Sequence, residues 1–536
     1  MTTPIEPPIE PNCAEPPPRT SEAAPSEIRS LSEPTRASNR LMVLDVMRGV
    51  ALFGIFMVNI PLFAMPMMEG FGGPTLADAS RNDLIGWWII ELFFQFKFIS
   101  MYSILFGAGF MLQRMRAERD GRSHNAVFVR RLLVLMVFGL IHALLIWYGD
   151  ILLMYSMLGF SLLLLGGMSA KALIRVGLGV LIFSAVLMTG FGLLQAVMIP
   201  PQAESAVDAT AAESADSSAD STTDSSADSS ADSTADSTAD SAADDDGAEP
   251  AFGSAELVVD ATRNAMAEAE NAGQPPVDAA QGADADVEED GDAEPAEQDD
   301  LRGFGAMMAS KFNPFDERWM AAETAAFRDG PFRDAFTFRS ILFVFGLLSS
   351  VFSWSWYVAG LFLFGAGLMK ADFFAADKVR WHRGCALLAI PGFALQVAHG
   401  WIMSAENFQM TPGSALMGGP YALGAAMLTM GYIGIICLLV HARPSAAAFR
   451  VISKPGRMGL TGYLAESVLA TAIMYWWGFA QFGRFDRLEL IGIVIAIYTA
   501  ILLFANIWFR FFAIGPLEWI WRSATYLRPI SLRSGS

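Results

Sequence analysis

Two of the five histidines in this sequence stand within long apolar segments, where a neutral imidazole can take a proton from a reacting group. These two are His142 and His399, and we expect them to be general-base candidates. His124, His382 and His441 fall in or beside basic loops, where a solvated side chain is the simpler interpretation. The histidines therefore point to proton transfer, either in group-transfer catalysis or in proton-coupled transport.

Other ionisable and polar side chains interrupt the apolar segments. Such groups cost several kcal/mol in a bilayer unless they are paired or hydrated, so each is a functional candidate. Lys97 can assist a developing oxyanion. Asp150 and Glu466 are candidates for substrate binding, although many such residues serve only as contacts between helices. Asp150 follows His142 by eight residues, about 80° round and about 12 Å along a straight helix, so we do not expect a direct pair.

The first apolar segment carries Asp45, Arg48 and Asn59, which share one face of a helix and are also candidates for substrate binding. Their spacing predicts an i, i+3 ion pair between Asp45 and Arg48. An anchor pair at the membrane boundary is an equally good interpretation.

Several enzyme classes have no support in the sequence. It contains no GxSxG, Walker, HExxH or intact GxGxxG motif. Serine hydrolases, nucleotide hydrolases and zinc proteases are therefore not supported, because motifs of this kind are their signatures. Cys13, Cys385 and Cys437 are widely spaced and fit neither a disulfide framework nor a zinc site. We expect no metal and no nucleic-acid partner.

Membrane helices must position these residues, because 53% of the chain is hydrophobic and only 17% is charged. About 20 apolar residues cross a hydrocarbon core about 30 Å thick. The sequence predicts an all-α, polytopic membrane helix bundle of about ten transmembrane helices. The ten segments are approximately 42–66, 84–113, 132–149, 151–168, 173–199, 337–369, 384–403, 416–441, 458–480 and 488–510.

The distribution of basic residues predicts the orientation of these spans. With the N terminus inside, cytoplasmic segments hold 24 Lys and Arg residues and external segments hold 9. Both termini are then cytoplasmic, in a bacterial plasma or inner membrane. Residues 1–38 and 511–536 form cytoplasmic tails, residues 39–200 hold helices one to five, and residues 337–510 hold helices six to ten.

The acidity of the chain is local. Residues 201–300 contain 29 acidic residues and one basic residue, whereas the rest carries a net charge of +9. This window repeats small polar and acidic residues without hydrophobic periodicity, so we expect a disordered external loop. Residues 301–336 alternate aromatic and charged residues and can form an amphipathic interfacial segment.

A possible internal repeat relates the two histidines. The run Leu-Phe-Gly-Ala-Gly at 105–109 recurs at 363–367, and the intervals from Gly107 to His142 and from Gly365 to His399 are 35 and 34 residues. We predict a degenerate parallel repeat that relates spans two to five to spans six to nine. A chance recurrence of small-residue packing motifs in glycine-rich spans explains the pattern slightly better.

Four motifs resemble the YeiB-like family, the domain of unknown function 418. They are Leu-Asp-Val-Met-Arg-Gly-Val-Ala-Leu-Phe-Gly-Ile at 44–55, Gly139-Leu-Ile-His142 followed by Gly149-Asp150, Gly-Arg-Met-Gly-Leu-Thr-Gly-Tyr at 456–463, and Gly-Pro-Leu-Glu-Trp at 515–519. The resemblance covers nearly all of the membrane portion but not the tails or the acidic loop. It implies a membrane protein but supplies little chemistry.

The first motif is also distantly similar to the transmembrane acyltransferase superfamily, which includes acyltransferase-3 proteins and the heparan-glucosaminide N-acetyltransferase type. In acyltransferase-3 proteins an Arg is followed, after ten intervening residues, by a catalytic His. Here that spacing joins Arg48 to Asn59, and an amide cannot act as a general base. The resemblance thus implies acyl transfer with a different base, for which His142 is the first candidate.

We therefore expect an integral-membrane acyltransferase that moves an acyl group from a cytosolic donor, acyl-coenzyme A, to an external glycan, lipid or small molecule with a hydroxyl or amino group. Arg48 and the basic inner rim would hold the donor phosphates. His142 would deprotonate the acceptor, and His399 or Lys97 would assist the oxyanion. The alternatives are a small-metabolite transporter with the same ten helices and a non-catalytic membrane scaffold.

Overall fold

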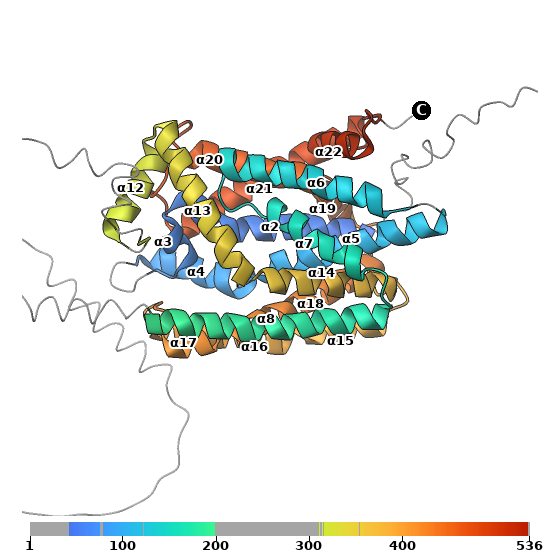
Figure 1. Ribbon diagram of the computed structural model, residues 1–536, viewed down its shortest axis with the longest axis horizontal. Coiled ribbons are helices and arrows are strands. Elements are labelled where there is room, and N and C mark those ends of the chain that lie inside the picture. The colour runs from blue at the N-terminus through green and yellow to red at the C-terminus, as the bar shows by residue number, and fades with distance from the viewer. Residues whose placement is uncertain are drawn as a thin grey trace, which may run out of the picture. The chain divides into compact units, whose positions relative to one another are not determined.

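Long apolar helices dominate the structure, as the apolar segments predict. The computed structural model describes residues 42–74, 79–121, 123–198, 310, 313–314, 316–352 and 354–533. The predicted N-terminal tail and acidic loop lie outside the described residues. All described residues belong to one unit, formed by residues 1–208 and 296–536. They form helices and no strand, which confirms the all-α membrane bundle (Figure 1).

The helices of the first half are α2 (Met42–Ala64), α3 (Met67–Phe71), α4 (Arg81–Phe93), α5 (Lys97–Arg119), α6 (Asn125–Ile141), the π-helical turn η2 (His142–Ile146), α7 (Leu152–Leu165) and α8 (Ala170–Met198). After the acidic loop come α12 (Glu317–Arg328), α13 (Phe332–Phe352), α14 (Ser355–Lys370), α15 (Val379–Leu387), α16 (Ala389–Ala405), α17 (Pro412–Leu416), α18 (Gly418–Ala442), α19 (Ala447–Arg457), α20 (Gly459–Met474), α21 (Arg487–Phe511) and α22 (Pro516–Tyr526).

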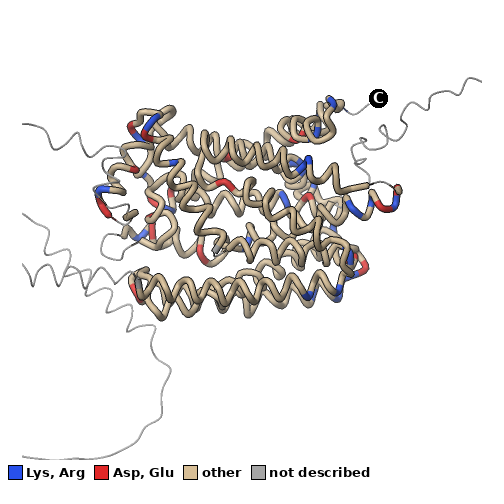
Figure 2. The backbone as a smooth tube through the Cα atoms, in the orientation of Figure 1, with Lys and Arg blue, Asp and Glu red and all other residues tan. Residues whose placement is uncertain are grey.

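Each of the ten predicted segments contains an apolar helix. Eight helices of the described chain are long and apolar enough to cross a membrane, and α7 and α20 are apolar but shorter. Charged residues gather towards the ends of the helices and are sparse between them (Figure 2). The number of crossings and the orientation of the bundle stay predictions.

The second and sixth predicted spans are each interrupted. Between α4 and α5 the backbone turns at Phe96, which has a positive φ of 65°. The second interruption lies between α13, which ends at Phe352, and α14, which begins at Ser355. Irregular backbone is tolerated at membrane depth where it is buried in protein or lines a cavity. These two interruptions are therefore expected to be buried or to line a cavity.

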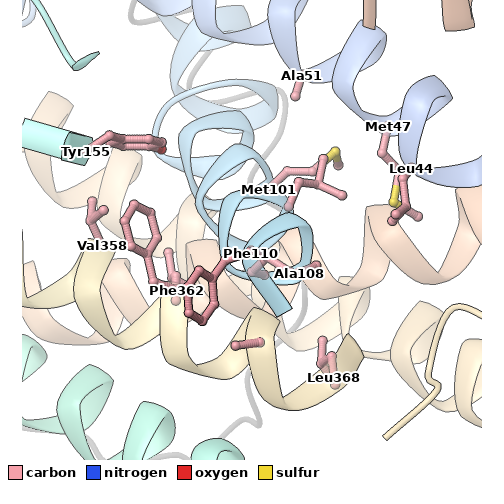
Figure 3. Close-up of a cluster of buried hydrophobic side chains, with 14 of the residues drawn as sticks. Leu44, Met47, Ala51, Met101, Ala108, Phe110, Tyr155, Val358, Phe362 and Leu368 are labelled. Carbon is pink, nitrogen blue, oxygen red and sulfur yellow. The ribbon is translucent and has the colours of Figure 1, made fainter. Parts of the chain in front are cut away.

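The repeated Leu-Phe-Gly-Ala-Gly runs form one helix crossing. A Cβ atom at Gly107 of α5 would lie 1.9 Å from the carbonyl oxygen of Phe362, and one at Gly365 of α14 would lie 2.1 Å from that of Ile104. Glycine is therefore required on both sides of this close approach. Around it, apolar side chains from α2, α5, α7 and α14 form the larger of two buried clusters (Figure 3).

Further contacts match one part of the predicted repeat, spans two to four against spans six to eight. Helix α6 packs on α7 as α16 packs on α18, and α14 contacts α7 as α5 contacts α18. The helices before the two interruptions also correspond, because each packs against the other half of the repeat: α4 packs on α16, and α13 packs on η2. This pattern is what a pseudo-twofold relation between residues 81–165 and 332–442 would produce.

Three of the family-like motifs pack together at another crossing. A Cβ atom at Gly456 of α19 would lie 1.9 Å from the carbonyl oxygen of Asp45 in α2. At the start of α20, the Glu518 carboxylate accepts hydrogen bonds from the backbone N–H groups of Leu460 and Thr461, at 2.7 and 3.1 Å. A carboxylate at a helix N-terminus satisfies donors that have no partner within the helix. These motifs therefore have structural roles.

Candidate functional site

A third helix interruption brings His142 and Asp150 together. Helix α6 ends at Ile141, η2 follows, and the backbone is extended at Trp147 before α7 begins. His142 Nδ1 and Asp150 Oδ1 lie 2.9 Å apart. The expectation that these residues do not pair was wrong, because it assumed a straight helix through residue 150.

Two neighbouring residues allow this break. A Cβ atom at Gly139 would lie 2.3 Å from Leu153 N and 2.7 Å from Asp150 Oδ2, so only glycine lets α7 approach this closely. The guanidinium of Arg339 on α13 donates to the carbonyl oxygens of Leu144 and Leu145, at 3.1 and 3.0 Å. These bonds satisfy acceptors at the end of η2, so Arg339 stabilises the turn that carries His142.

The His142 ring is buried behind Asp150. Its side chain has no exposed surface, and it packs 5.1 Å from the ring of Tyr463 and 6.2 Å from that of Trp147. Asp150 Oδ2 also accepts the N–H of Leu153 at 2.7 Å, as a helix cap does. His142 thus orients Asp150 rather than facing open space itself.

A second histidine–carboxylate pair joins α16 to α4. His399 Nδ1 lies 3.1 Å from Glu91 Oε1, and the imidazole stacks on the Tyr421 ring at 4.0 Å. A Cβ atom at Gly400 would lie 2.6 Å from the ring of Trp88, so this glycine permits the two helices to approach. With Nδ1 directed at the carboxylate, Nε2 of His399 is the nitrogen left for another partner.

Lys97 holds the second pair in place. Its ammonium group is fully buried and donates to the backbone oxygen of Glu91 and to Gln396 Oε1, both at 2.5 Å. The Gln396 amide in turn donates to the backbone oxygen of Tyr421 at 3.0 Å. Lys97 therefore fixes the neighbours of His399, and the structure gives it no direct place on the cavity described next.

One cavity of about 520 Å³ is lined by three of the eight candidate residues. Its wall includes Asn59, Asp150 and His399 from the sequence-based set, together with Glu91. Three helix interruptions also line it, through Phe96, Gly149 and Trp354. A cavity of this volume is typical of sites for small molecules, and discontinuous helices at such a site are a feature of membrane binding sites.

Other predicted residues lie elsewhere. Asp45 and Arg48 form the expected i, i+3 ion pair at 3.0 Å, but they are absent from the cavity wall. Arg48 stands about 16 Å and Asp45 about 21 Å along α2 from Asn59. Glu466 is buried on α20, away from the wall, and its Oε1 has no hydrogen-bond partner among the described residues.

Sequence reasoning assigned no site role to two important residues. Glu91 is a polar residue within the second apolar span, and nothing local in the sequence points to its partner His399, 308 residues away. Arg339 is a charged residue within the sixth apolar span. Its proximity to a break in another helix had no signal in the sequence.

The short helix α12 packs against the bundle beside the cavity. Its apolar side packs on protein, since Trp319 and Phe327 are buried and the Phe327 ring stacks on Tyr475 at 4.8 Å. Glu323 Oε1 accepts the N–H of Met67, which lines the cavity, at 3.0 Å. The placement of α12 along a membrane surface stays a prediction.

The Glu323 contact predicts a pH-dependent stability. Burial raises the pKa of this carboxyl from 4.5 to about 8, against the opposing effect of the Met67 hydrogen bond. Since the folded state favours the protonated form, stability should fall as pH rises from about 4.5 to about 8, by at most about 1.4 kcal/mol per pH unit. We expect Glu323→Gln to flatten this slope in thermal unfolding at pH 5 and pH 8. Glu317→Gln, at an exposed position of the same helix, should retain it, and an equal slope in both variants would contradict the assignment.

The comparisons with known proteins agree with the family resemblance. The family model described as "Protein of unknown function (DUF418)" matches residues 368–528. The uncharacterized protein YxaH of Bacillus subtilis (strain 168) is 26% identical over 510 residues, which cover 94% of this chain and 98% of YxaH. The uncharacterized protein YeiB of Escherichia coli (strain K12) is 25% identical over 500 residues, which cover 91% of this chain and 96% of YeiB. No solved structure matches the chain. Both relatives align along nearly the whole chain and the family model matches residues 368–528, so the comparisons support the YeiB-like DUF418 family for this membrane protein.

Proposed function

We propose that the protein is a membrane acyltransferase that transfers an acyl group to a hydroxyl or amino group bound in the 520 Å³ cavity. The observation that carries this proposal is the His399–Glu91 pair on the cavity wall. A carboxylate at Nδ1 fixes the ring and its tautomer, which leaves Nε2 to act as a general base. His399 thus replaces His142 as the preferred base, because only His399 lies on the wall.

The reaction follows from these positions. The acceptor oxygen or nitrogen attacks the thioester carbonyl, a C–O or C–N bond forms, and the C–S bond breaks. His399 Nε2 takes the acceptor proton and returns it to the departing thiolate. Asp150 lines the cavity, and its buried carboxylate, held by His142 and by the N–H of Leu153, fixes the segment that forms this part of the wall around the acceptor. Lys97 acts through Glu91 and Gln396 as a positioning residue.

The donor in this proposal is a cytosolic acyl-coenzyme A. Arg48 of the Asp45–Arg48 pair lies on the same helix as Asn59, about 16 Å away. If Arg48 binds the donor phosphates, the flexible arm of coenzyme A must extend along α2 to bring its thioester to the cavity. The membrane is then the bacterial plasma or inner membrane, with Arg48 on the cytoplasmic side.

A transporter is the second candidate function, and the broken helices favour it. Discontinuous spans and an internal repeat around a central cavity are typical of secondary transporters. Two buried histidine–carboxylate pairs can also carry protons during transport. A transporter would move its substrate unchanged.

One reconstitution experiment separates these functions. Purified protein in proteoliposomes receives acetyl-coenzyme A labelled in the acetyl group, together with hydroxyl- or amino-bearing acceptors. We expect binding of the thioester, release of the free thiol and transfer of the label to an acceptor. Uptake of an unaltered metabolite without any acetyl-coenzyme A binding would instead favour the transporter.

A further inference from the structure

The cavity has a wall suited to a hydrocarbon chain. Most of its lining side chains are aliphatic, aromatic or methionine, among them Met188 and Phe191 on α8 and Phe343 and Leu347 on α13. The acidic and histidine residues of the lining are Glu91 on α4, Asp150 in the segment before α7 and His399 on α16. An acceptor that fits both parts is amphiphilic, with a polar group beside His399 and an apolar chain against α8 and α13.

Gly346 marks where this wall meets the outside of the bundle. It lines the cavity and is also exposed, within the candidate span Phe332–Val351. A Cβ atom at Gly346 would have no atom within 4 Å. The cavity is thus open beside Gly346 at a position that, in a membrane, faces lipid rather than water.

The neighbouring helices leave room for such an opening. Helix α13 packs on α12, η2 and α14, whereas α8 packs on α14, α17 and α18. The two helices flank the cavity and run obliquely to each other (Figure 1). Both belong to candidate membrane spans, so an opening between them leads into the hydrocarbon layer.

We propose that the acceptor is a membrane lipid whose acyl chain enters the cavity sideways between α8 and α13, past Gly346. This inference rests on the proposed function for the reaction, but the lipid site itself is defined by the cavity. The lipid's hydroxyl or amino group lies beside His399, and its chain lies along Phe343 and Met188. A water-soluble glycan has no apolar chain to pack against the apolar side chains of α8 and α13.

Photolabelling tests the site without requiring catalysis. The full-length protein is reconstituted in vesicles containing phosphatidylethanolamine with a diazirine near the head-group end of one acyl chain, irradiated and mapped by mass spectrometry. We expect adducts on Trp147 and Tyr421, which line the cavity and are only 1% and 7% exposed. Lipid on the outer surface of the bundle cannot reach these side chains, so adducts confined to exposed residues would overturn the proposal.

A matched pair of tryptophan variants tests the entrance. Gly346→Trp adds a large side chain at the opening, and we expect it to lower labelling of Trp147 and Tyr421 at least tenfold. Gly190→Trp adds the same side chain at an exposed position of α8 that also has open space but does not line the cavity, and labelling should stay within twofold. Equal labelling in both variants would reject this entrance. Since labelling does not depend on acyl transfer, a labelled but inactive protein would count against the enzyme and not against the lipid site.

Discussion

His399→Ala should lower acyl transfer by a factor of about 10² to 10⁴, the usual contribution of a positioned general base. The alanine removes the only histidine ring that the structure places on the cavity wall among the described residues. Glu91 then loses its partner at 3.1 Å, while Lys97 remains bound to Gln396. The measurement is the initial rate of acyl transfer by the purified protein, compared with its binding of the labelled thioester.

The matched control is His441→Ala. His441 stacks on His382 at 5.5 Å, at the far end of α18 from Tyr421, and does not line the cavity. Its removal should leave the rate within about twofold. Glu91→Gln keeps the size of the side chain but weakens the charge-assisted bond to His399, so it should reduce the rate by about 10- to 100-fold. Full activity in both His399→Ala and Glu91→Gln would reject His399 as the base.

The helices were predictable because apolar length is a local property of the sequence. Each predicted span, even the short one that became α7, contains an apolar helix, since lipid-compatible segments must satisfy their backbone hydrogen bonds internally. The Asp45–Arg48 pair was predictable for the same reason, because both residues lie on one turn of one helix.

The arrangement of the site was much less predictable. The His399–Glu91 contact joins residues 308 positions apart, and no local pattern specifies it. The breaks at Phe96 and Trp147 fall inside strongly apolar runs, where hydropathy predicts a continuous helix. The repeat of Gly107 and Gly365 was visible in the sequence, whereas their direct contact across one crossing required the tertiary structure.

Asp150→Asn should separate the two tasks of this residue. Asparagine is as good a helix cap as aspartate, so it can still accept the Leu153 N–H, and stability should change by less than about 1 kcal/mol. Its amide lacks the negative charge that holds the His142 Nδ1 proton, so the turn that forms this part of the cavity wall is held less firmly around the acceptor. We therefore expect kcat/KM for the acceptor to fall about 10- to 100-fold, with unchanged binding of the acyl donor.

His142→Ala completes this test, because His142 is proposed to act through Asp150. The single variant should also lower kcat/KM for the acceptor, and the double variant with Asp150→Asn should be no slower than the worse single variant, as for residues that work as a unit. A residue that served only as a helix cap would leave the kinetics of Asp150→Asn unchanged. Additive losses in the double variant would instead show that His142 and Asp150 act independently, which would contradict the role given to their 2.9 Å contact.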